Sequence, residues 1–534
     1  MLFTSYAFIG FMLVTVILYY LVPKKIQTLF LLAASYAFYA FAGWQCLVYI
    51  AAITLIVYAG TMAIERSRDR QTQWVAANKP VLPGEEIKKY KHKQQNRRQL
   101  ICIAVTAAIV LILAVAKYLE FILSNLNSVF SFTDTSGPVI RSGFLSGFLM
   151  PMGISFYVLQ ALGYLIDVYR ETVQAEKNLI KTALFISFFP QLIQGPISRF
   201  QDLSKTLFVP HSFDWHTVSF GLQRVLWGFF KKLVIADRIL IGVKTIISDT
   251  AQYNGAYVFI GMILFSLELY ADFSGGIDIA IGVGQMLGIT IQENFDRPYF
   301  SRSLKEYWRR WHMSMCNWFR TYLFFSVSTA PWMQKFTKFC RRKFSNTIGK
   351  NLPVYASSLV VWFTTGLWHG ANWNYVVWGL LNWFILMMSE ILEPLYAKFR
   401  NRIGCAEKLP YRLFQMLRTF LLICCMNVFD WELPVRTTVG LFGSIFTAGN
   451  WHIIADGSLL KLGLGITDYI IIGIGLLIVL TVSLLQNAGS VRERIAARPF
   501  AVRYIIWFGM FVSVLLFGIY GIGYDAAQFI YNRF

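Results

Sequence analysis

The sequence has little charge for its length. Only 14% of its 534 residues are charged, against about 25% in an average soluble protein, while 56% are hydrophobic and 17% are aromatic. A water-soluble fold could not bury so much apolar surface. Several apolar runs are also long enough to cross the ~30 Å hydrocarbon layer of a bilayer. The composition therefore excludes an ordinary soluble protein and predicts a polytopic integral membrane protein.

Motifs for metals, nucleotides and serine hydrolases are also absent. The seven cysteines show no C-x-x-C spacing, which argues against a zinc site and a disulfide framework. No G-x-x-x-x-G-K-[ST] loop and no H-x-x-x-H or H-E-x-x-H pattern occurs, so neither a P-loop nucleotide site nor a zinc-protease helix is expected. Gly153-Ile-Ser-Phe-Tyr157 fails the G-x-S-x-G pattern at its last position. We therefore expect no metal and no bound cofactor.

The formal net charge of +21 sits in short segments between the apolar runs. Ten Lys or Arg residues fall within residues 65–98. Because basic residues collect in cytoplasmic loops, we predict a basic cytoplasmic loop there. The same bias, followed along the chain, places both termini on the extracytoplasmic side. No folded basic face is visible, so we expect no binding to nucleic acid.

The apolar runs predict an all-α polytopic membrane protein with about 11–13 full or partial transmembrane helices. Residues 1–142 would hold N-terminal transmembrane helices, residues 143–395 a core, and residues 396–534 C-terminal transmembrane helices. Proline and glycine interrupt the apolar segments of the core at 190–196 and at 275–276. Irregular backbone at membrane depth survives only where protein or a water-filled cavity satisfies its polar groups. We therefore expect broken helices around a central funnel.

Three carboxylates, Glu268, Asp272 and Asp278, lie inside the apolar run 258–287. An ionised carboxylate at the bilayer centre costs about 2.5–3.5 kcal/mol on the insertion scale, so all three must face a polar interior. Glu268 and Asp272 are four residues apart, hence on one helical face. Two interpretations are open for each carboxylate: structural pairing with nearby Arg or Trp N–H groups, or lining of a substrate path.

Two of the six histidines lie in apolar or amphipathic surroundings. From Ser303 the sequence predicts an amphipathic helix whose aromatic stripe includes His312, with basic residues opposite, as in an interfacial helix on the cytoplasmic side. His369 lies between Gly366 and Gly370, which permit a tight turn or close backbone approach. Each feature alone is compatible with packing. Together with the carboxylates and broken helices, they indicate histidine acid–base or nucleophilic chemistry in a membrane cavity.

Four segments within residues 151–373 resemble the membrane-bound O-acyltransferase family, in particular its bacterial branch that acylates cell-surface polymers. They read Pro-Met-Gly-Ile-Ser-Phe-Tyr at 151–157, Phe-Phe-Pro-Gln-Leu-Ile-Gln-Gly-Pro-Ile at 188–197, Tyr-Ala-Asp-Phe-Ser-Gly at 270–275 and Gly-Leu-Trp-His-Gly-Ala-Asn-Trp at 366–373. They follow the family's order, and the flanking apolar runs fit as well. The C-terminal portion beginning near residue 431 is similar to the alginate O-acetylation branch, whereas teichoic-acid D-alanyl transferases are shorter relatives.

The resemblance implies a role for each histidine. The family's invariant histidine matches His369, which would lie deep in the funnel and act either as general base for an attacking hydroxyl or as a transient acyl-carrying nucleophile. The family's second histidine matches His312, which would position the thioester donor on the cytoplasmic side. Trp368, Asn372 and Asp272 are further candidates for shaping the tunnel.

The resemblance also implies the substrates and the compartment. A cytoplasmic acyl thioester, either acetyl-CoA or an acyl carrier protein, would donate an acyl group, acetyl in the first place. Hydroxyls of an exported cell-surface polysaccharide would accept it. The enzyme would be a multi-pass protein of the bacterial plasma membrane, in contact with lipid, and an extracytoplasmic acetyltransferase partner would complete the transfer.

The chain departs from the family at one place, and two alternative functions stay open. Family members continue Trp-Phe-Arg with Asp-Tyr and a Pro-Leu-Gly-Gly loop, whereas this chain continues Trp318-Phe-Arg320 with Thr321-Tyr322; the difference concerns the donor side. D-alanyl transfer from a carrier protein to teichoic acid would use the same architecture. A solute transporter would also explain broken helices and buried carboxylates, although transporters commonly show repeated halves and none is visible.

Overall fold

The computed structural model describes residues 2–132, 151–404, 408–521 and 524. All regular structure in these ranges is helical, which confirms the all-α class. Seven helices within them are long and apolar enough to cross a membrane: Trp44–Asn78, Gly84–Ser128, Ala256–Met286, Trp373–Ile403, Leu409–Trp431, Ile466–Ala488 and Phe500–Phe517. Two shorter apolar helices, Tyr6–Leu21 and Ile154–Tyr169, accompany them. The protein is therefore a multi-pass membrane protein.

The chain forms two compact units. One contains residues 1–218 and 283–291, and the other contains residues 219–282 and 292–534. The predicted boundary at 142/143 lies outside the described residues. The predicted boundary at 395/396 falls inside a continuous helix, α18 (Trp373–Ile403). The three-part division of the sequence thus stays a prediction.

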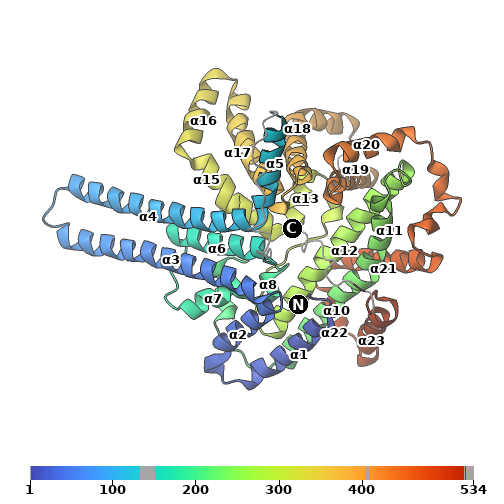
Figure 1. The fold of residues 1–534 in the computed structure, drawn as a ribbon, viewed down its shortest axis with the longest axis horizontal. Coiled ribbons are helices and arrows are strands. Elements are labelled where there is room, and N and C mark those ends of the chain that lie inside the picture. Colours follow the sequence, from blue (N-terminus) through green and yellow to red (C-terminus); the bar gives the residue numbers. More distant parts are fainter. Residues whose placement is uncertain (1, 133–150, 405–407, 522–523, 525–534) are drawn as a thin grey trace. The chain divides into compact units, whose positions relative to one another are not determined.

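The first unit begins with a series of helices that are joined by short turns (Figure 1). Its elements are α1 (Tyr6–Leu21), η1 (Lys24–Ile26), α2 (Gln27–Ala40), α3 (Trp44–Asn78), α4 (Gly84–Leu113), η2 (Ala114–Tyr118), α5 (Leu119–Phe132), α6 (Ile154–Tyr169), α7 (Leu179–Ser187), α8 (Phe189–Leu192) and α9 (Phe200–Leu207). The predicted break at 190–196 is confirmed, because α8 ends there and the next helix starts at Phe200. Gln191 supports this irregular backbone by donating to the Pro196 carbonyl at 2.9 Å, as buried non-helical chain requires.

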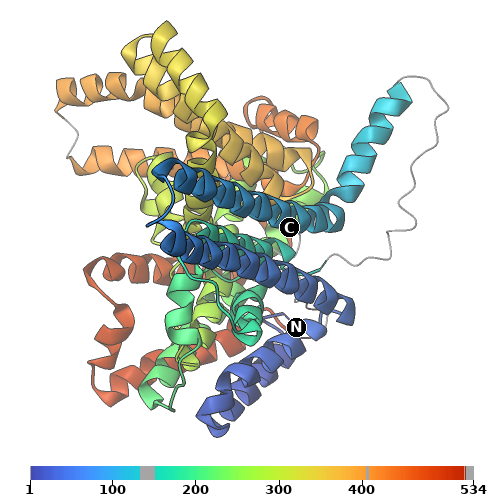
Figure 2. The same ribbon diagram turned by 90° about the vertical axis from the view of Figure 1, so that its left-hand side faces the viewer.

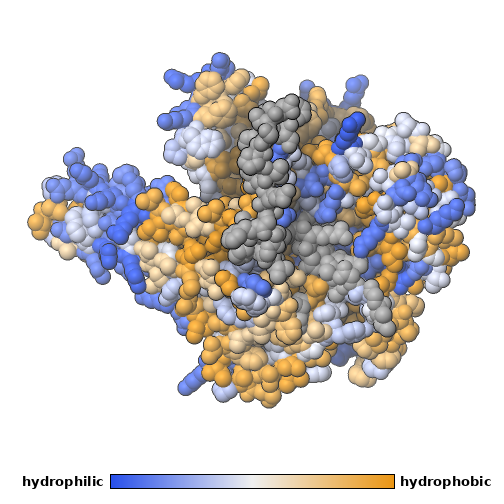
Figure 3. Space-filling view, in the orientation of Figure 1, coloured by the Kyte–Doolittle hydropathy of each residue, from blue (hydrophilic) through white to orange (hydrophobic). Residues whose placement is uncertain are grey.

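Helices α3 and α4 lie side by side and form a long hairpin; Figure 2 shows the same pair from another side. The predicted basic loop at 65–98 is in fact the helical end of this hairpin and its short turn. The Trp74 and Tyr90 rings stack at 3.8 Å between centroids, and Arg98 donates to Gln71 at 2.7 Å. These contacts hold the helices together beyond their apolar parts. Hydrophilic side chains gather at the far end (Figure 3).

The second unit holds both histidines of interest. Its helices are α10 (Trp215–Phe229, from residue 219), η4 (Phe230–Ala236), α11 (Asp237–Ser248), α12 (Ala256–Met286, to residue 282), η5 (Pro298–Phe300), α13 (Leu304–Arg310), α14 (Met313–Trp318), η6 (Phe319–Phe324), α15 (Phe325–Thr329), α16 (Pro331–Lys343), α17 (Asn346–His369), α18, α19 (Leu409–Asn427), η7 (Val428–Trp431), α20 (Val435–Thr447), η8 (Trp451–Ile454), η9 (Ser458–Leu462), α21 (Ile466–Leu485), η10 (Gln486–Ala488), α22 (Val491–Ala496) and α23 (Phe500–Phe517). Helices α17 and α18 pack against each other along their lengths. Their junction carries His369.

The predicted break at Gly275 and Gly276 is wrong, because α12 runs through both residues without interruption. The glycines serve packing instead. A Cβ atom added at Gly275 would lie 2.9 Å from the Gly228 carbonyl oxygen, and one added at Gly228 would lie 2.6 Å from the Gly275 carbonyl oxygen. About two helical turns further along α12, a Cβ atom added at Gly282 would lie 2.7 Å from the Gly221 carbonyl oxygen. Small residues thus let α10 and α12 approach closely, as is common between membrane helices.

We expect Gly228→Val to lower the thermal unfolding midpoint of the purified protein. The added side chain would overlap α12, and overpacking of this kind costs about 1–3 kcal/mol. Gly473→Val is the matched control, because Gly473 also lies in an apolar helix but has nothing within 4 Å of its added Cβ. The measurement is thermal unfolding of both variants in detergent. Equal midpoints for the two variants would contradict the close helix contact.

Candidate active site

His369 is the last residue of α17, and the short turn after it leads directly into α18. Gly366 lies so close to the Tyr375 carbonyl that a Cβ atom there would overlap it. The two helices therefore meet next to the imidazole. Asn372 caps α18, since its side chain accepts a hydrogen bond from the Asn374 backbone N–H at 3.2 Å. This hydrogen bond fixes the turn between α17 and α18, which directly follows His369.

His312 lies at a break between two short helices. The single amphipathic helix predicted from Ser303 is wrong: α13 ends at Arg310, and α14 starts at Met313. His312 itself has φ +43°, a left-handed conformation that non-glycine residues rarely adopt. Such strain persists only where the surroundings enforce it, and it clusters at functional sites. The break turns the imidazole into the interior, where the residue is fully buried.

Asn294 holds this break in place. Its side-chain oxygen accepts from the Ser314 N–H at 3.0 Å, and its backbone oxygen accepts from the Met313 N–H at 3.0 Å. The same side chain meets Nδ1 of His312, with the amide nitrogen at 3.2 Å and the amide oxygen at 3.3 Å. Asn294 thus supports the start of α14 and orients the His312 ring through Nδ1. That orientation leaves Nε2 as the ring nitrogen directed away from Asn294.

The two imidazoles meet at one indole ring, that of Trp368. The ring centroid of Trp368 lies 6.0 Å from that of His312 and 5.1 Å from that of His369. On the outer sides of the pair, Phe273 lies 4.8 Å from His312 and Trp378 lies 4.6 Å from His369. The structure therefore brings together His312, Trp368 and His369, which lie far apart in the sequence, in an aromatic enclosure.

The enclosure changes the chemistry of His312. Burial, and to a smaller extent the neighbouring His369, lowers the pKa of the His312 imidazole well below its usual value. The ring is therefore neutral at ordinary pH, so that one of its nitrogens can accept a hydrogen bond and the other can donate one. Low dielectric surroundings also strengthen electrostatic interactions with a developing charge. The pair can act in acid–base or nucleophilic chemistry on a substrate that reaches Trp368.

Asp272 lies in a buried ion cluster. Its carboxylate is 2.5 Å from the Lys232 ammonium, which also contacts Asp237 at 2.8 Å. All three side chains are essentially unexposed. Removing one partner of a buried pair leaves an uncompensated charge and is strongly destabilising. This contact corresponds to the structural pairing considered for Asp272, with a lysine as the partner.

Asp278 is paired as well, and Glu268 is buried in the same helix. Arg224 donates to Asp278 at 2.9 Å and to Glu293 through two hydrogen bonds at 2.6 and 2.5 Å. Lys231 contacts Asp278 at 2.6 Å. Glu268 is 2% exposed in α12. Asp278 also lines a cavity, so pairing and cavity lining coincide at this residue.

A cavity of about 600 Å³ lies beside the enclosure and is mostly apolar. Among its lining residues, Trp308 and Phe319 connect it to the imidazoles. The Phe319 ring lies 6.3 Å from Trp368, and the Trp308 ring lies 5.6 Å from Trp378. Two basic side chains, Lys305 and Arg320, and two acidic ones, Glu390 and Glu393, also line it. His312 and His369 are not among the lining residues of this cavity. The rings of Phe319 and Trp308 connect it to Trp368 and Trp378 beside the histidine pair.

Sequence reasoning missed Asn294, Trp378 and the basic partners of the carboxylates. Asn294 lies in a largely polar stretch, residues 292–297, and nothing in its spacing relates it to His312. Arg224 and Lys231 lie in a separate helix, so only the fold reveals their pairing. Within the described ranges no group of three His, Cys, Asp or Glu side chains could hold a metal ion.

Comparison with known proteins gives consistent results. Residues 171–429 match the membrane-bound O-acyltransferase family. The chain is 31% identical over 438 residues to a probable alginate O-acetylase of Pseudomonas putida, covering 82% of this chain and 78% of that protein. It is 28% identical over 329 residues to the peptidoglycan O-acetyltransferase of Helicobacter pylori, covering 57% of each chain. It is 27% identical over 246 residues to the teichoic acid D-alanyltransferase of Streptococcus thermophilus, covering 45% of this chain and 56% of that one.

The lowered pKa of His312 predicts an acid-sensitive fold. In the unfolded chain the imidazole titrates near pH ~6.5, whereas burial lowers its pKa in the folded protein. Below pH ~6.5 the unfolded chain therefore binds a proton that the folded protein excludes, and stability falls as the pH drops. We expect the thermal midpoint to fall between about pH 7.5 and 5.5, and to fall less in His312→Gln.

The control for this pH series is His92→Gln. His92 is exposed on the α3–α4 hairpin, so its substitution should leave the pH dependence of the wild type unchanged. Midpoints of all three proteins are measured across the same buffers. A pH dependence that is identical in His312→Gln and in the wild type would show that His312 does not titrate as its burial requires.

Proposed function

The chain belongs to the membrane-bound O-acyltransferase family and is a membrane acyltransferase, and from this premise we propose its substrates. We propose that it moves an acyl group, acetyl in the first place, from a cytoplasmic thioester to hydroxyls of an exported cell-surface polysaccharide. The observation that carries the proposal is the pair of buried histidines that meet at Trp368. We therefore assign the acyl transfer to the two histidines beside Trp368.

His369 is the proposed reacting group. As a general base it would take the proton of an attacking hydroxyl, while the hydroxyl oxygen bonds to the acyl carbon and the thiolate leaves with a proton. As a nucleophile it would carry the acyl group on its imidazole first and pass it to the hydroxyl afterwards. Both routes need a neutral imidazole next to the thioester. His369 is buried, with 8% of the residue exposed.

The cavity lined by Lys305 and Arg320 is the proposed entrance for the donor. A thioester donor carries phosphate groups together with a long neutral arm, and basic side chains bind phosphate. The mostly apolar wall beyond them leads to Phe319, whose ring faces Trp368. A donor arm that displaces this ring would bring its acyl carbon to the histidine pair. His312 would position the donor there.

The acceptor is proposed from the names of similar proteins. Relatives at 31% and 28% identity are named for O-acetylation of alginate and of peptidoglycan, and both polymers are polysaccharides outside the cytoplasm. Separation of a cytoplasmic donor from an external acceptor explains why the chemistry lies within a membrane protein. An extracytoplasmic acetyltransferase partner would then complete transfer to the polymer. The plasma membrane of a bacterium is the proposed location, with both termini outside the cytoplasm.

His369→Ala should abolish acylation of the exported polymer while the protein still accumulates in the membrane. Loss of a general base alone costs about 10²–10⁴-fold in rate. The measurement is mass analysis of ester-linked groups on envelope and exported glycans from cells with either form. His92→Ala is the control, because His92 is exposed on the α3–α4 hairpin.

The nature of the lost ester decides between the proposals. Loss of O-acetyl groups in His369→Ala supports acetyl transfer to a polysaccharide. Loss of D-alanyl esters from teichoic acid would favour the function named for the more distant relatives. Full acylation with normal membrane levels of the variant would contradict a reacting role for His369.

Lys305→Glu combined with Arg320→Glu should raise KM for the thioester donor and leave kcat nearly unchanged. The substitutions place negative charge at the entrance, whereas the reacting groups lie beyond Phe319. Arg309→Glu is the matched control, since Arg309 is exposed on the same helix as Lys305 but does not line the cavity. Steady-state acyl transfer by purified protein tests this. A KM equal to that of the control would place the donor elsewhere.

A further inference from the structure

A second cavity lies between the core of the second unit and its C-terminal helices. It has a small polar inner chamber of about 70 Å³ and a larger outer chamber of about 500 Å³. The two chambers adjoin, because they share lining residues that include Arg224, Glu293 and Gln486. Neither the histidine pair nor the donor entrance belongs to it. Its location raises the question of what it binds.

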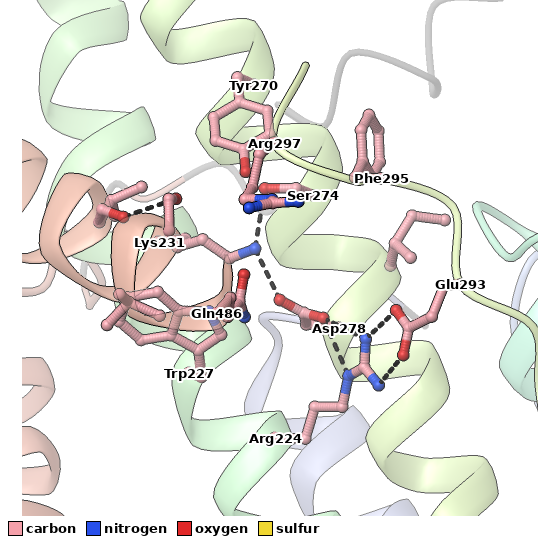
Figure 4. A pocket seen from close by; sticks show the side chains of 14 residues that line it. Arg224, Trp227, Lys231, Tyr270, Ser274, Asp278, Glu293, Phe295, Arg297 and Gln486 are labelled. Atoms are coloured by element: carbon pink, nitrogen blue, oxygen red, sulfur yellow. Dashed lines mark hydrogen bonds and ion pairs between the residues drawn. The ribbon is translucent and has the colours of Figure 1, made fainter. Parts of the chain in front are cut away.

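The inner chamber is built from charged side chains that are already ordered. Figure 4 shows Lys231 directed at Ser274 and Asp278, and Arg224 placed between Asp278 and Glu293. These residues come from η4, α10, α12 and the loop that follows α12. Because both cations are fixed by carboxylates, the chamber offers a preorganised polar floor and needs no rearrangement to receive a ligand.

The charges of the whole cavity favour an anion. Four basic residues line its chambers, against three acidic ones, so the lining carries a formal charge of +1: Arg224, Lys231, Arg297 and Arg492 against Asp278, Glu293 and Asp296. Arg492 donates to the Phe220 carbonyl at 2.8 Å and lies over the Phe220 ring. Burial and the neighbouring Arg224 lower the pKa of Arg492. A bound anion would stabilise this cation.

The outer chamber is apolar on the side of the C-terminal helices. Val491 and Ile495 of α22, and Trp507 and Met510 of α23, form this side. The chamber lies beside the end of α21 and the middle of α23, and both of these helices are apolar enough to cross a membrane. Basic residues cluster in the connecting segment, which indicates the cytoplasmic interface: Arg492, Arg494, Arg498 and Arg503. The cavity therefore joins a polar end that contains basic residues to an apolar wall.

We propose that this cavity binds the headgroup of an anionic phospholipid from the cytoplasmic leaflet. The phosphate would lie between Arg492 and Arg297, whose guanidinium also donates to Asp296 at 2.9 Å and to Asn487 at 2.6 Å. The polar headgroup would meet Gln486 and Glu293 in the inner chamber. The acyl chains would follow the apolar side formed by α22 and α23. Basic pockets between transmembrane helices on this side of a membrane are known to suit anionic headgroups.

The proposed lipid would also act on the histidine site. The cavity wall includes Glu293, Phe295 and Arg297, which surround Asn294 in the sequence. Asn294 orients His312, so a headgroup that orders this loop would order the imidazole as well. This effect goes beyond the proposed acyl transfer, since lipid binding itself needs no acyl donor.

The test uses the purified full-length protein, stripped of lipid in a neutral detergent, and thermal unfolding as the readout. Added phosphatidylglycerol should raise the midpoint by several degrees, and phosphatidylcholine should not. Arg297→Gln with Arg492→Gln should remove the effect. Arg498→Gln with Arg503→Gln should retain it, because both arginines are exposed and lie outside the two chambers.

A second variant distinguishes loss of lipid binding from misfolding of the double arginine variant. Gln486→Trp fills the wall shared by both chambers without removing a charge, and it too should abolish the shift. Equal shifts with both lipids, or shifts retained in both cavity variants, would overturn the proposal. Inorganic phosphate or coenzyme A that reproduces the shift, with no effect of phosphatidylglycerol, would assign the site to a soluble phosphate instead. Loss of acyl transfer in His369→Ala is independent of each of these results.

Discussion

The contact between Asn294 and His312 is the interaction on which the site depends. His312 is held in a left-handed backbone conformation that an isolated chain would avoid. Asn294 compensates by satisfying two backbone N–H groups at the start of α14 and by meeting the imidazole at Nδ1. Its neighbour Glu293 is held in turn by Arg224 through two hydrogen bonds. A continuous series of contacts therefore leads from Arg224 on α10 to the His312 imidazole.

That series exists because α10 and α12 approach closely. Gly228 and Gly275 bring the two backbones together, and the residues that follow Gly228 can then reach carboxylates on α12. Lys232 meets Asp272 and Lys231 meets Asp278 as a result. Buried ion pairs contribute little net stability, since desolvation offsets much of their attraction. Here they select one register between the helices, and the register fixes where Asn294 lies.

The composition of the sequence was sufficient to predict the class of the fold. Contacts between residues far apart in the chain could not be predicted from it. Apolar runs and basic segments were sufficient for the all-α membrane class, and glycines around His369 marked it as unusual. The expectation that glycine interrupts a helix failed at Gly275, where glycine permits close packing of an unbroken helix. Periodicity also failed at His312, because tertiary contacts of Asn294 override the amphipathic pattern. Partners such as Arg224 belong to another helix, so no local pattern could relate them to Asp278.

The short helix after His312 separates two cavities. Met313 lines the outer chamber beside α22 and α23, and Met315 lines the cavity that contains Lys305 and Arg320. Residues two apart in an α-helix point about 200° away from each other, so α14 presents one face to each cavity. A ligand in either cavity would contact α14 and could thereby shift the His312 imidazole that precedes this helix. Two ligands of different chemistry could be coupled in this way without contact between them, because a rigid element that both sides bias is sufficient for coupling.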